Sequence, residues 1–282
     1  MECCVNHLFC FGFGFSARAL SQRLKHHGWK ISATSRDTDG VAKISDSGLD
    51  GYIFNAQLKI PGDVTHLLIS APPDENGDPV LALFSRQLQS LKHLQWLGYL
   101  STTGVYGDKG GDWVDEETPL APNTARGVRR LAAEQAWLKL GLPVHLFRLA
   151  GIYGPGRNQL VDVLNGTAKR IVKQGQIFSR IHVEDIAGVL AASIARPNPR
   201  QAYNVCDDEP CPPQDVVAYA AQLVGQPLPP EIPFGQAALT PMARSFYADS
   251  KRVSNARIKT ELGYQLRYPN YRVGLAALRL AI

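Results

Sequence analysis

Near its N-terminus the chain reads His7-Leu-Phe-Cys-Phe-Gly12-Phe-Gly14-Phe-Ser-Ala17, and this stretch decides the fold. Its apolar start is typical of a buried strand, and the glycines that follow predict a tight turn into a helix. In such a turn Gly12 permits the sharp bend, Gly14 lets the backbone approach a pyrophosphate, and the small Ala17 lets helix and strand pack closely. A helical pattern follows over Ser16–His27 and a second apolar run over Trp29–Thr34, within one unit of about 30 residues. We therefore expect a dinucleotide-binding unit that holds a pyrophosphate on the amide groups at the helix start.

Beyond this unit, the first 150 residues go on alternating short apolar runs with amphipathic stretches. That alternation is typical of a parallel sheet wrapped by helices, so the expected fold class is α/β: a doubly wound, mostly parallel Rossmann sheet. The further strands that we expect are Gly51–Phe54, His66–Ser70, Trp96–Ser101 and Val144–Leu149, and the further helices are Val41–Ser45, Val80–Leu91 and Arg129–Leu138. Sheets of this kind bind ligands beyond the carboxyl ends of their strands.

After about residue 151 the alternation loosens and prolines become frequent. Gln214–Val224 still reads as a helix, whereas Gly225–Thr240 is rich in Pro and Gly and predicts a mobile loop. We expect residues 1–150 to form the dinucleotide-binding Rossmann core. Residues 151–282 would then be a mixed region that completes the sheet and forms a smaller C-terminal substrate lobe.

Composition narrows the class of protein. The chain of 282 residues has a formal net charge of +5 and is 45% hydrophobic, as an ordinary globular protein is. Its basic residues lack helix-turn-helix or aromatic context, so we expect no nucleic-acid partner, and a solvated helix face or an anion pocket explains them better. No apolar run approaches membrane-spanning length, and no Lys or Arg precedes Leu8–Ala17, which we interpret as mature protein rather than a signal peptide. The spacing of the cysteines indicates neither zinc nor a disulfide framework, which predicts a reducing cytoplasm and no metal; they are Cys3, Cys4, Cys10, Cys206 and Cys211.

The end of the second predicted strand bears on the choice between NAD and NADP. An NAD site usually has Asp or Glu there to bind the ribose hydroxyls. This chain has Thr34-Ser35-Arg36, and an arginine beside a hydroxyl suits a 2′-phosphate. We therefore favour NADP, and because Asp37 follows directly and could bind a ribose, NAD stays possible.

Several ordered segments resemble the extended short-chain dehydrogenase/reductase family, which contains NAD(P)-dependent sugar epimerases and dehydratases. Besides the glycine turn, they are Ser101-Thr-Thr-Gly-Val-Tyr-Gly107, Arg148-Leu-Ala-Gly-Ile-Tyr-Gly-Pro-Gly156 and Ile181-His-Val-Glu-Asp-Ile-Ala187. Glu116–Pro119 and Tyr203–Val205 also fit in order and spacing. The resemblance covers nearly the whole chain and implies the fold and a nicotinamide cofactor.

The family's catalytic residues carry over only in part. In the family, catalysis rests on a Ser or Thr and on a Tyr-x-x-x-Lys pair at the start of a helix; the Ser/Thr position corresponds to Thr102. The helix is recognisable from Leu131-Ala-Ala-Glu134, which follows the Lys directly in the family, so Arg130 stands at the Lys position and Arg126 at the Tyr position. Arginine stays protonated at neutral pH and cannot act as a general base. The chain therefore resembles an atypical member that lacks the Tyr/Lys pair, similar to the bacterial YeeZ-type proteins.

The resemblance and the residue chemistry together define the candidate site residues. Thr102 would bind a carbonyl, and Tyr106 and Tyr153 are substitute proton donors that follow strand ends. An anionic substrate could be held by Arg126, Arg129, Arg157 or Arg180. The expected cofactor-binding residues are Gly12, Gly14, Phe15, Ser16, Ala17, Ser35, Arg36, Ala71, Pro72, Thr102 and Arg130.

Other polar residues have a structural interpretation that we prefer. His182 could titrate near neutrality, but its place at a strand-to-helix junction favours a hydrogen-bonded structural histidine. Asp185 and Asp115-Glu116-Glu117 are expected to be helix-cap and loop carboxylates rather than a catalytic pair.

Two functions remain open from the sequence. The first is an NADP-dependent oxidoreductase or epimerase-like enzyme that acts on a small polar substrate. The alternative is a non-catalytic NADP-binding sensor or regulatory protein, since the proton-transfer pair is missing while the cofactor turn is kept. Relatives often form homodimers through two helices that correspond to Val80–Leu91 and Arg129–Leu138, but these are only moderately apolar here, so a monomer also stays open.

Overall fold

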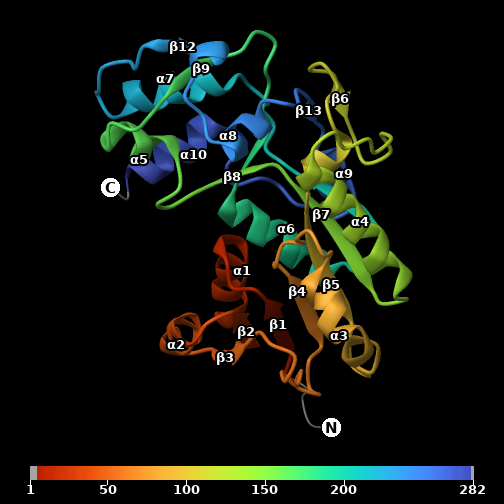
Figure 1. The fold of residues 1–282 in the computed structure, drawn as a ribbon. Helices are drawn as coiled ribbons and strands as arrows, with labels where there is room; N and C mark the ends of the chain where they lie inside the picture. Colours follow the sequence, from red (N-terminus) through yellow and green to blue (C-terminus); the bar gives the residue numbers. More distant parts are fainter. Residues whose placement is uncertain (1–4, 281–282) are drawn as a thin grey trace. The chain divides into compact units, whose positions relative to one another are not determined.

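The computed structural model describes residues 5–280, so Cys3 and Cys4 lie outside the described residues (Figure 1). Its main feature is a seven-stranded sheet in the order β11-β7-β5-β4-β1-β2-β3. The pairs β3–β2, β2–β1, β1–β4 and β4–β5 are parallel. The strands are β1 (His7–Phe11), β2 (Lys30–Ser35), β3 (Asp50–Ile53), β4 (His66–Ile69), β5 (Trp96–Thr102), β7 (Val144–Leu149) and β11 (Ala202–Val205). This is the α/β Rossmann-like sheet that the sequence predicts, and every strand expected in the first 150 residues forms within one residue of its predicted bounds.

Helices cover both faces of this sheet. On one face, α3 (Pro79–Gln89) and α4 (Ala125–Lys139) contribute Phe84 and Trp137 to a core that includes Phe9 and Phe11. The rings of Phe11 and Phe84 lie 5.3 Å apart. On the other face, Cys10 contacts Ser21 of α1 (Phe15–Lys25), and the Trp96 indole donates a hydrogen bond to Ser193 of α6 (Val183–Ala195). Another helix, α2 (Thr38–Asp46), joins β2 to β3.

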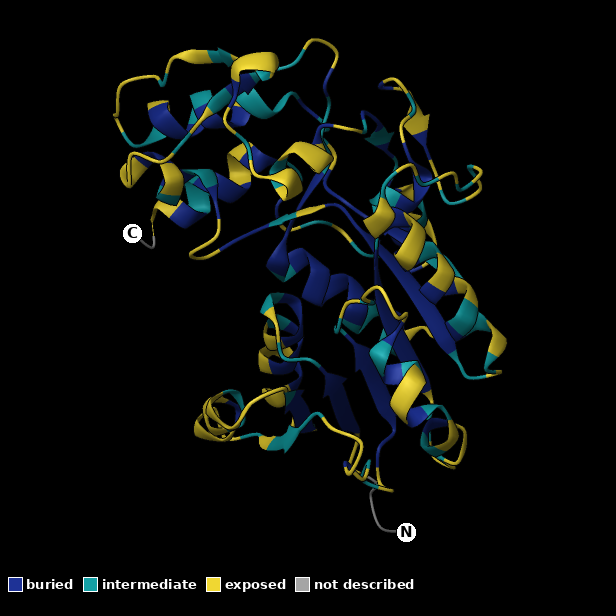
Figure 2. Ribbon diagram, viewed as in Figure 1, coloured by how far each residue is buried: buried dark blue, intermediate teal, exposed yellow. Residues whose placement is uncertain are grey.

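Burial on both faces explains why the central strands are apolar without alternation. All residues of β1, β4 and β7 are buried, and these strands are dark blue throughout in Figure 2. Strands of a parallel sheet covered on both sides need apolar side chains facing both ways. Their carboxyl ends are therefore where polar groups and ligands can meet.

The chain divides into two compact units that interleave in sequence. The first consists of Met1–Ser101, Arg129–Arg148 and Ile186–Tyr203, and the second of Thr102–Val128, Leu149–Asp185 and Asn204–Ile282. The second unit contains three parallel strand pairs: β8 (Gly151–Tyr153) with β10 (Arg180–His182), β9 (Arg170–Val172) with β12 (Glu231–Pro233), and β6 (Trp113–Val114) with β13 (Arg252–Val253). Its helices are α5 (Gln159–Leu164), α7 (Pro213–Leu223), α8 (Pro241–Phe246), α9 (Ala256–Thr260) and α10 (Tyr271–Arg279). The simpler division at residue 150 stays a prediction.

The segment Gly225–Thr240 is more ordered than the sequence predicts. It contains β12, which pairs with β9, and a short 3-10 helix, η2 (Phe234–Gln236). Phe234 and Leu239 pack against a cluster that includes the buried Tyr247. Apolar side chains between the prolines therefore fix this segment in place. The prediction of a mobile loop rested on the Pro and Gly content and did not take these side chains into account.

Candidate functional site

The glycine turn after β1 has the backbone shape that the motif predicts. Gly12 has φ of +85°, which disfavours any residue with a side chain. A Cβ atom added to Gly12 would lie 3.2 Å from the backbone nitrogen of Ala71, which follows β4. The Gly12 amide also donates a hydrogen bond of 2.9 Å to the Thr34 hydroxyl near the end of β2. The ends of three neighbouring strands therefore fix this turn.

Helix α1 starts with amide groups that no side chain caps. Its N-cap residue, Gly14, is exposed and makes no side-chain capping bond, and the first turn contains no acidic residue. Ala17 and Ser16 are buried against the sheet and Phe15 is half-buried. A helix start without a capping side chain leaves its orphan N–H groups and its positive dipole end for an anion.

The end of β2 presents the groups that we expect at the ribose. Ser35 is half-buried and Arg36 is exposed. Asp37 accepts a hydrogen bond of 2.7 Å from the Gly40 amide and so caps α2. A carboxylate that caps a helix is committed to backbone N–H groups, which weakens the case for Asp37 as a ribose ligand.

Arg130, which the sequence predicts to stand at the family's Lys position, lies buried in the first unit. Its Nη1 donates to the Leu100 carbonyl at 2.5 Å and approaches the Tyr99 hydroxyl at 3.5 Å, while its buried Nε has no partner among the described residues. Ser101 donates to Glu134, which also pairs with Arg148 at 3.0 Å. The Glu134 carboxylate therefore connects three elements: it binds Ser101 at the end of β5 and Arg148 on β7 from its own place on α4.

Thr102 and Arg126 belong to one cluster in the second unit. The Thr102 hydroxyl accepts a 3.2 Å hydrogen bond from the Gly104 amide, at the start of η1 (Thr103–Tyr106). A Cβ atom on Gly127 would lie 2.7 Å from the Gly104 carbonyl oxygen, so the first turn of α4 rests directly on the Thr102–Gly104 turn. The Arg126 guanidinium lies 5.4 Å from the ring centre of Phe246. The structure thus brings Thr102, Arg126 and Phe246 into one neighbourhood.

The two candidate tyrosines are packed inside the second unit. Tyr106 is fully buried and its hydroxyl donates to Asn204 at 2.7 Å. Tyr153 is 4% exposed, and its hydroxyl lies where a Cβ atom on Gly274 of α10 would be only 2.1 Å away. Burial raises the pKa of Tyr153, and the carboxyl group of Asp207 adds to that rise. These surroundings favour packing roles for both, so neither arrangement supports the proton-donor roles that the sequence suggests.

The remaining candidate arginines have different surroundings. Arg129 and Arg157 are exposed. Arg180 is buried, and its Nη1 donates to the Phe178 carbonyl and contacts Cys211 Sγ, both at 3.1 Å. Arg180 is therefore bound inside the second unit, whereas the Arg129 and Arg157 side chains lie at the surface.

Lys251 is a residue that the sequence reasoning missed. It is 7% exposed, and its Nζ donates to the Gly107 carbonyl at 2.8 Å and pairs with Asp249 at 3.1 Å. Burial lowers the pKa of Lys251, which the Asp249 charge opposes. It holds the end of the Thr102–Gly107 segment, and no motif signals it because it lies in an irregular stretch far along the chain.

His182 and Asp185 act as structural residues. The His182 Nδ1 accepts from the Glu184 amide at 3.2 Å, at the junction of β10 and α6, as the sequence predicts. Asp185 is not a helix cap: it is fully buried and accepts hydrogen bonds from the Tyr264 hydroxyl and from the Arg267 and Tyr268 amides, at 2.7–3.0 Å. That expectation was wrong because its partners come from a loop some 80 residues later.

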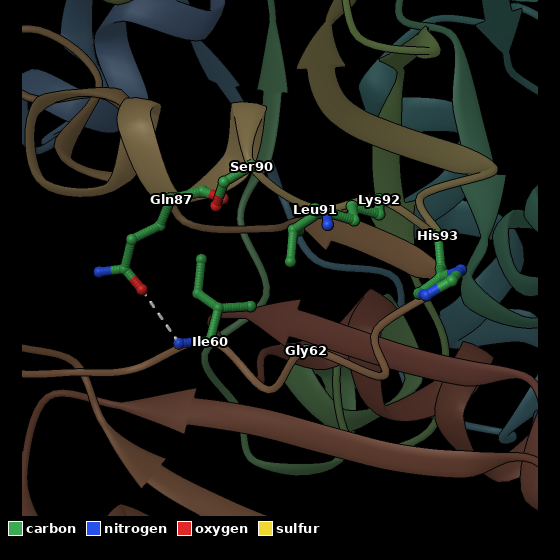
Figure 3. Close-up of a pocket in the computed structure, with 7 residues that line it drawn as sticks. All are labelled: Ile60, Gly62, Gln87, Ser90, Leu91, Lys92 and His93. Atoms are coloured by element: carbon green, nitrogen blue, oxygen red, sulfur yellow. Dashed lines mark hydrogen bonds between the residues drawn. The ribbon is translucent and has the colours of Figure 1, made fainter.

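A shallow pocket in the first unit lies at the opposite ends of the strands from the glycine turn. It opens beside the loops that precede β4 and β5, at the amino ends of those strands rather than the carboxyl ends (Figure 3). Gln87 spans part of it by accepting from the Ile60 amide. Its lining consists of Ile60, Gly62, Gln87, Ser90, Leu91, Lys92 and His93.

Across residues 5–280, no three His, Cys, Asp or Glu side chains are grouped to hold a metal, and no helix is long and apolar enough to span a membrane.

Known proteins similar to this chain agree with its fold. Residues 82–206 match the NAD dependent epimerase/dehydratase family. Protein YeeZ of Escherichia coli (strain K12) is 28% identical, over 92% of this chain and 95% of its own length. A 3-diazoavenalumate denitrifying reductase of a Streptomyces species is 28% identical over 59% of each chain.

Solved structures extend the comparison. A functionally unknown conserved protein from Silicibacter pomeroyi is 56% identical, covers 98% of this chain and 99% of its own, and has a TM-score of 0.93. A dTDP-glucose 4,6-dehydratase from Bacillus anthracis, in complex with NAD, has a TM-score of 0.78 at 19% identity, covering 97% and 95% of the two chains. The human epimerase family protein SDR39U1, with NADPH, has a TM-score of 0.78 at 17% identity, covering 98% and 100%.

The glycine turn at the ends of β1, β2 and β4, the sheet order and these comparisons agree with one another. Residues 82–206 match the NAD dependent epimerase/dehydratase family, the chain as a whole is similar to protein YeeZ, and its sheet is the α/β Rossmann-like fold of the solved neighbours.

Proposed function

We propose that this protein binds NADP through the glycine turn and acts as an oxidoreductase on a small polar substrate. The observation that carries the proposal is the start of α1, where Gly14 leaves the helix amides without a capping side chain. Gly12 and Ala71 bring two strand ends together beside it, in a space that a side chain on Gly12 would fill. Residues that would hold the cofactor are Gly12, Gly14, Phe15, Ser16, Ala17, Ser35, Arg36, Ala71 and Pro72.

Arg36 supports NADP over NAD. It is exposed at the end of β2, next to the Ser35 hydroxyl, and a guanidinium binds a phosphate with two parallel hydrogen bonds. Asp37, the residue that favoured NAD, is bound to the amide of Gly40. A solved structure with the same fold holds NADPH and another holds NAD, so the relatives support a nicotinamide cofactor of either kind.

The missing Tyr/Lys pair favours reduction over epimerisation. An epimerase must take a proton from a substrate oxygen and return it, whereas a net reduction needs one proton, which water can deliver to the alkoxide that hydride transfer leaves. The bound cofactor would supply or take up a hydride. With Arg126 and Arg130 at the two positions, neither residue can exchange a proton with a substrate oxygen at neutral pH. Thr102 can still donate a hydrogen bond to a carbonyl, and Arg126 can stabilise a negative charge on the substrate. The name of the Streptomyces relative as a reductase agrees with this choice.

A non-catalytic NADP sensor is the second candidate. The burial of the Tyr106 and Tyr153 hydroxyls favours it, because neither group is placed as a replacement acid. The decisive measurement is NADPH oxidation across a panel of aldehydes, ketones and conjugated acids. No oxidation of any substrate by a protein that binds NADPH would replace the enzyme proposal by the sensor.

The Gly14→Ala variant tests cofactor binding at the turn. A Cβ atom on Gly14 would meet nothing closer than the Ser70 hydroxyl at 3.8 Å, so we expect thermal stability close to that of the natural chain. The new methyl group would occupy the space through which the backbone approaches the pyrophosphate, so NADPH affinity should fall about tenfold or more. NADPH fluorescence titration measures this. Gly235→Ala, at a glycine with no heavy atom within 4 Å of its added Cβ, is the matched control. Unchanged affinity in Gly14→Ala would remove the turn as the cofactor site.

Arg36→Ala tests the choice of cofactor. The variant should lose about tenfold or more in NADPH affinity, because a charge-assisted bond to the 2′-phosphate is lost, and little in NADH affinity. The two affinities are measured by the same titration, with Arg279→Ala as the control for removing an exposed arginine. Equal losses for both cofactors would contradict the preference for NADP.

A further inference from the structure

One cationic and apolar surface in the second unit is not accounted for by cofactor binding. It consists of Arg126 at the start of α4 and of Met242 and Phe246 on α8. Met242 is 71% exposed and Phe246 is 49% exposed. Because they are four residues apart, both lie on one side of α8. The Arg126 guanidinium lies over the Phe246 ring, 5.4 Å from its centre, so charge and apolar surface are adjacent.

This surface is held next to Thr102. Gly127 follows Arg126 directly, and a side chain there would collide with the Gly104 carbonyl oxygen, at 2.7 Å from its Cβ. The Thr124 hydroxyl accepts from the Gly127 amide at 3.1 Å and fixes the same turn. Gly104 in turn donates to Thr102. The first turn of α4 therefore fixes the backbone of Arg126 beside the residue at which the family's Ser/Thr acts.

The charge of the surface is positive. The first turn of α4 contains no acidic residue, and the positive end of the dipole of this 15-residue helix adds to the Arg126 charge. A complementary ligand carries a negative charge, and it carries an apolar part that can cover Met242 and Phe246.

We propose that Arg126 and Phe246 form the specificity subsite for a planar organic acid, an aromatic or conjugated carboxylate, as the substrate. The carboxylate binds the guanidinium edge through two parallel hydrogen bonds, and the conjugated part lies on the exposed side of Phe246 and Met242. This inference rests on the proposed function, because the acid is bound as the substrate beside Thr102. The replacement of the family's Tyr by Arg126 then exchanges a proton donor for a substrate anchor.

Direct binding tests the subsite without any need for turnover. Calorimetric titration of the full chain, with and without saturating NADPH, compares three probes: trans-cinnamate, the neutral trans-cinnamamide and the non-planar 3-cyclohexylpropanoate. We expect cinnamate to bind about tenfold tighter than either of the others. The amide lacks the negative charge, and the cyclohexyl acid lacks a planar conjugated group that can lie on the Phe246 ring. Equal affinities for cinnamate and cinnamamide would overturn the proposal.

Variants assign the binding to the two residues. Arg126→Ala should weaken cinnamate binding about tenfold or more, and Arg126→Lys should restore only part of it, because lysine lacks the planar fork. Phe246→Leu should weaken it several-fold while keeping an apolar side chain. Arg279→Ala and Trp113→Leu remove an exposed arginine and an exposed tryptophan elsewhere and should leave the affinity unchanged.

The cofactor separates the two proposals. NADPH affinity should be the same in Arg126→Ala as in the natural chain. A loss of NADPH binding as large as the loss of cinnamate binding would make Arg126 a cofactor ligand and overturn the subsite. A natural chain that binds cinnamate in this pattern but does not bind NADPH would instead contradict the proposed function and leave the anion subsite standing.

Discussion

Asp207 shows how strongly the surroundings of one residue alter its chemistry. Its carboxyl group is 1% exposed, and its Oδ2 has no hydrogen-bond partner among the described residues. Burial raises the pKa of Asp207 to about 8, although the Arg180 charge opposes that rise. A neutral carboxyl group is the cheaper state there, because a buried carboxylate loses its hydration.

Asp207→Asn should remove the pH dependence of stability that this group contributes. Because the pKa of Asp207 in the folded chain lies above the ordinary aspartate value of 3.8, the stabilisation is complete below about pH 3.8 and is lost as the pH rises through about 8. Asparagine does not ionise, so the variant should gain stability relative to the natural chain between pH 4 and 8, by roughly 1–3 kcal/mol at the upper end. Urea denaturation across this range measures the difference, with Asp39→Asn as the exposed control. A difference that does not change with pH would show that Asp207 titrates normally.

At the scale of elements, α10 packs closely against β8 because it has a glycine at the point of contact. Gly274 of α10 lies against the Tyr153 ring, where a Cβ atom would be 2.1 Å from the hydroxyl oxygen and 2.7–2.8 Å from ring carbons. Tyr271 and Leu275 of the same helix are buried in the cluster that contains Tyr153. The helix can approach the strand this closely only because position 274 is glycine.

Gly274→Ala should therefore destabilise the protein by about 1–3 kcal/mol, the usual cost of overpacking a core. In the double variant with Tyr153→Phe, the cost should be smaller than the sum of the single costs, since the nearest atom has been removed. Tyr153→Phe alone should retain any hydride-transfer activity. Thermal denaturation and NADPH oxidation measure these outcomes, and an inactive but folded Tyr153→Phe would restore the tyrosine as a proton donor.

At the scale of the whole molecule, the order of the strands determines where the cofactor turn lies. β1 sits between β4 and β2: the chain runs from β1 to β2 and β3 on one side, and then crosses to β4 on the other side of β1. Such a switch point opens a crevice at the carboxyl ends of the strands, where Gly12 follows β1 and Ala71 follows β4. The pocket beside Ile60 lies at the amino ends of the strands, which is why it takes no part in the proposal.

Binding at this crevice should stabilise the folded chain. At a concentration 100 times its dissociation constant, NADPH should add about 2.7 kcal/mol to the free energy of unfolding. The natural chain should therefore unfold at a higher temperature with NADPH, and Gly14→Ala should show a much smaller rise at the same concentration. Differential scanning calorimetry measures both. An equal rise in the two proteins would place NADPH at another site.

The sequence by itself determined the sheet, its first two strands and the glycine turn between them. These follow from local rules: apolar runs of strand length, a helical period, and glycines where the backbone needs them. The placement of Arg126 and Arg130 at the family's Tyr and Lys positions, made from the Leu131–Glu134 segment of the same helix, stays a prediction. The order of the second unit's elements was less predictable, since its strands have only two or three residues.

Only the tertiary structure decided what the polar residues contact. Lys251 reaches the Gly107 carbonyl from 144 residues away, and Asp185 accepts hydrogen bonds from residues 79 to 83 positions later. Tyr153 packs against α10 because Gly274 leaves room for its ring, a contact that no local pattern predicts. Local sequence fixes backbone shape through sterics and periodicity, whereas burial and partners depend on which distant segments meet. The glycine turn could therefore be read from the chain, and the surface formed by Arg126 and Phe246 could not.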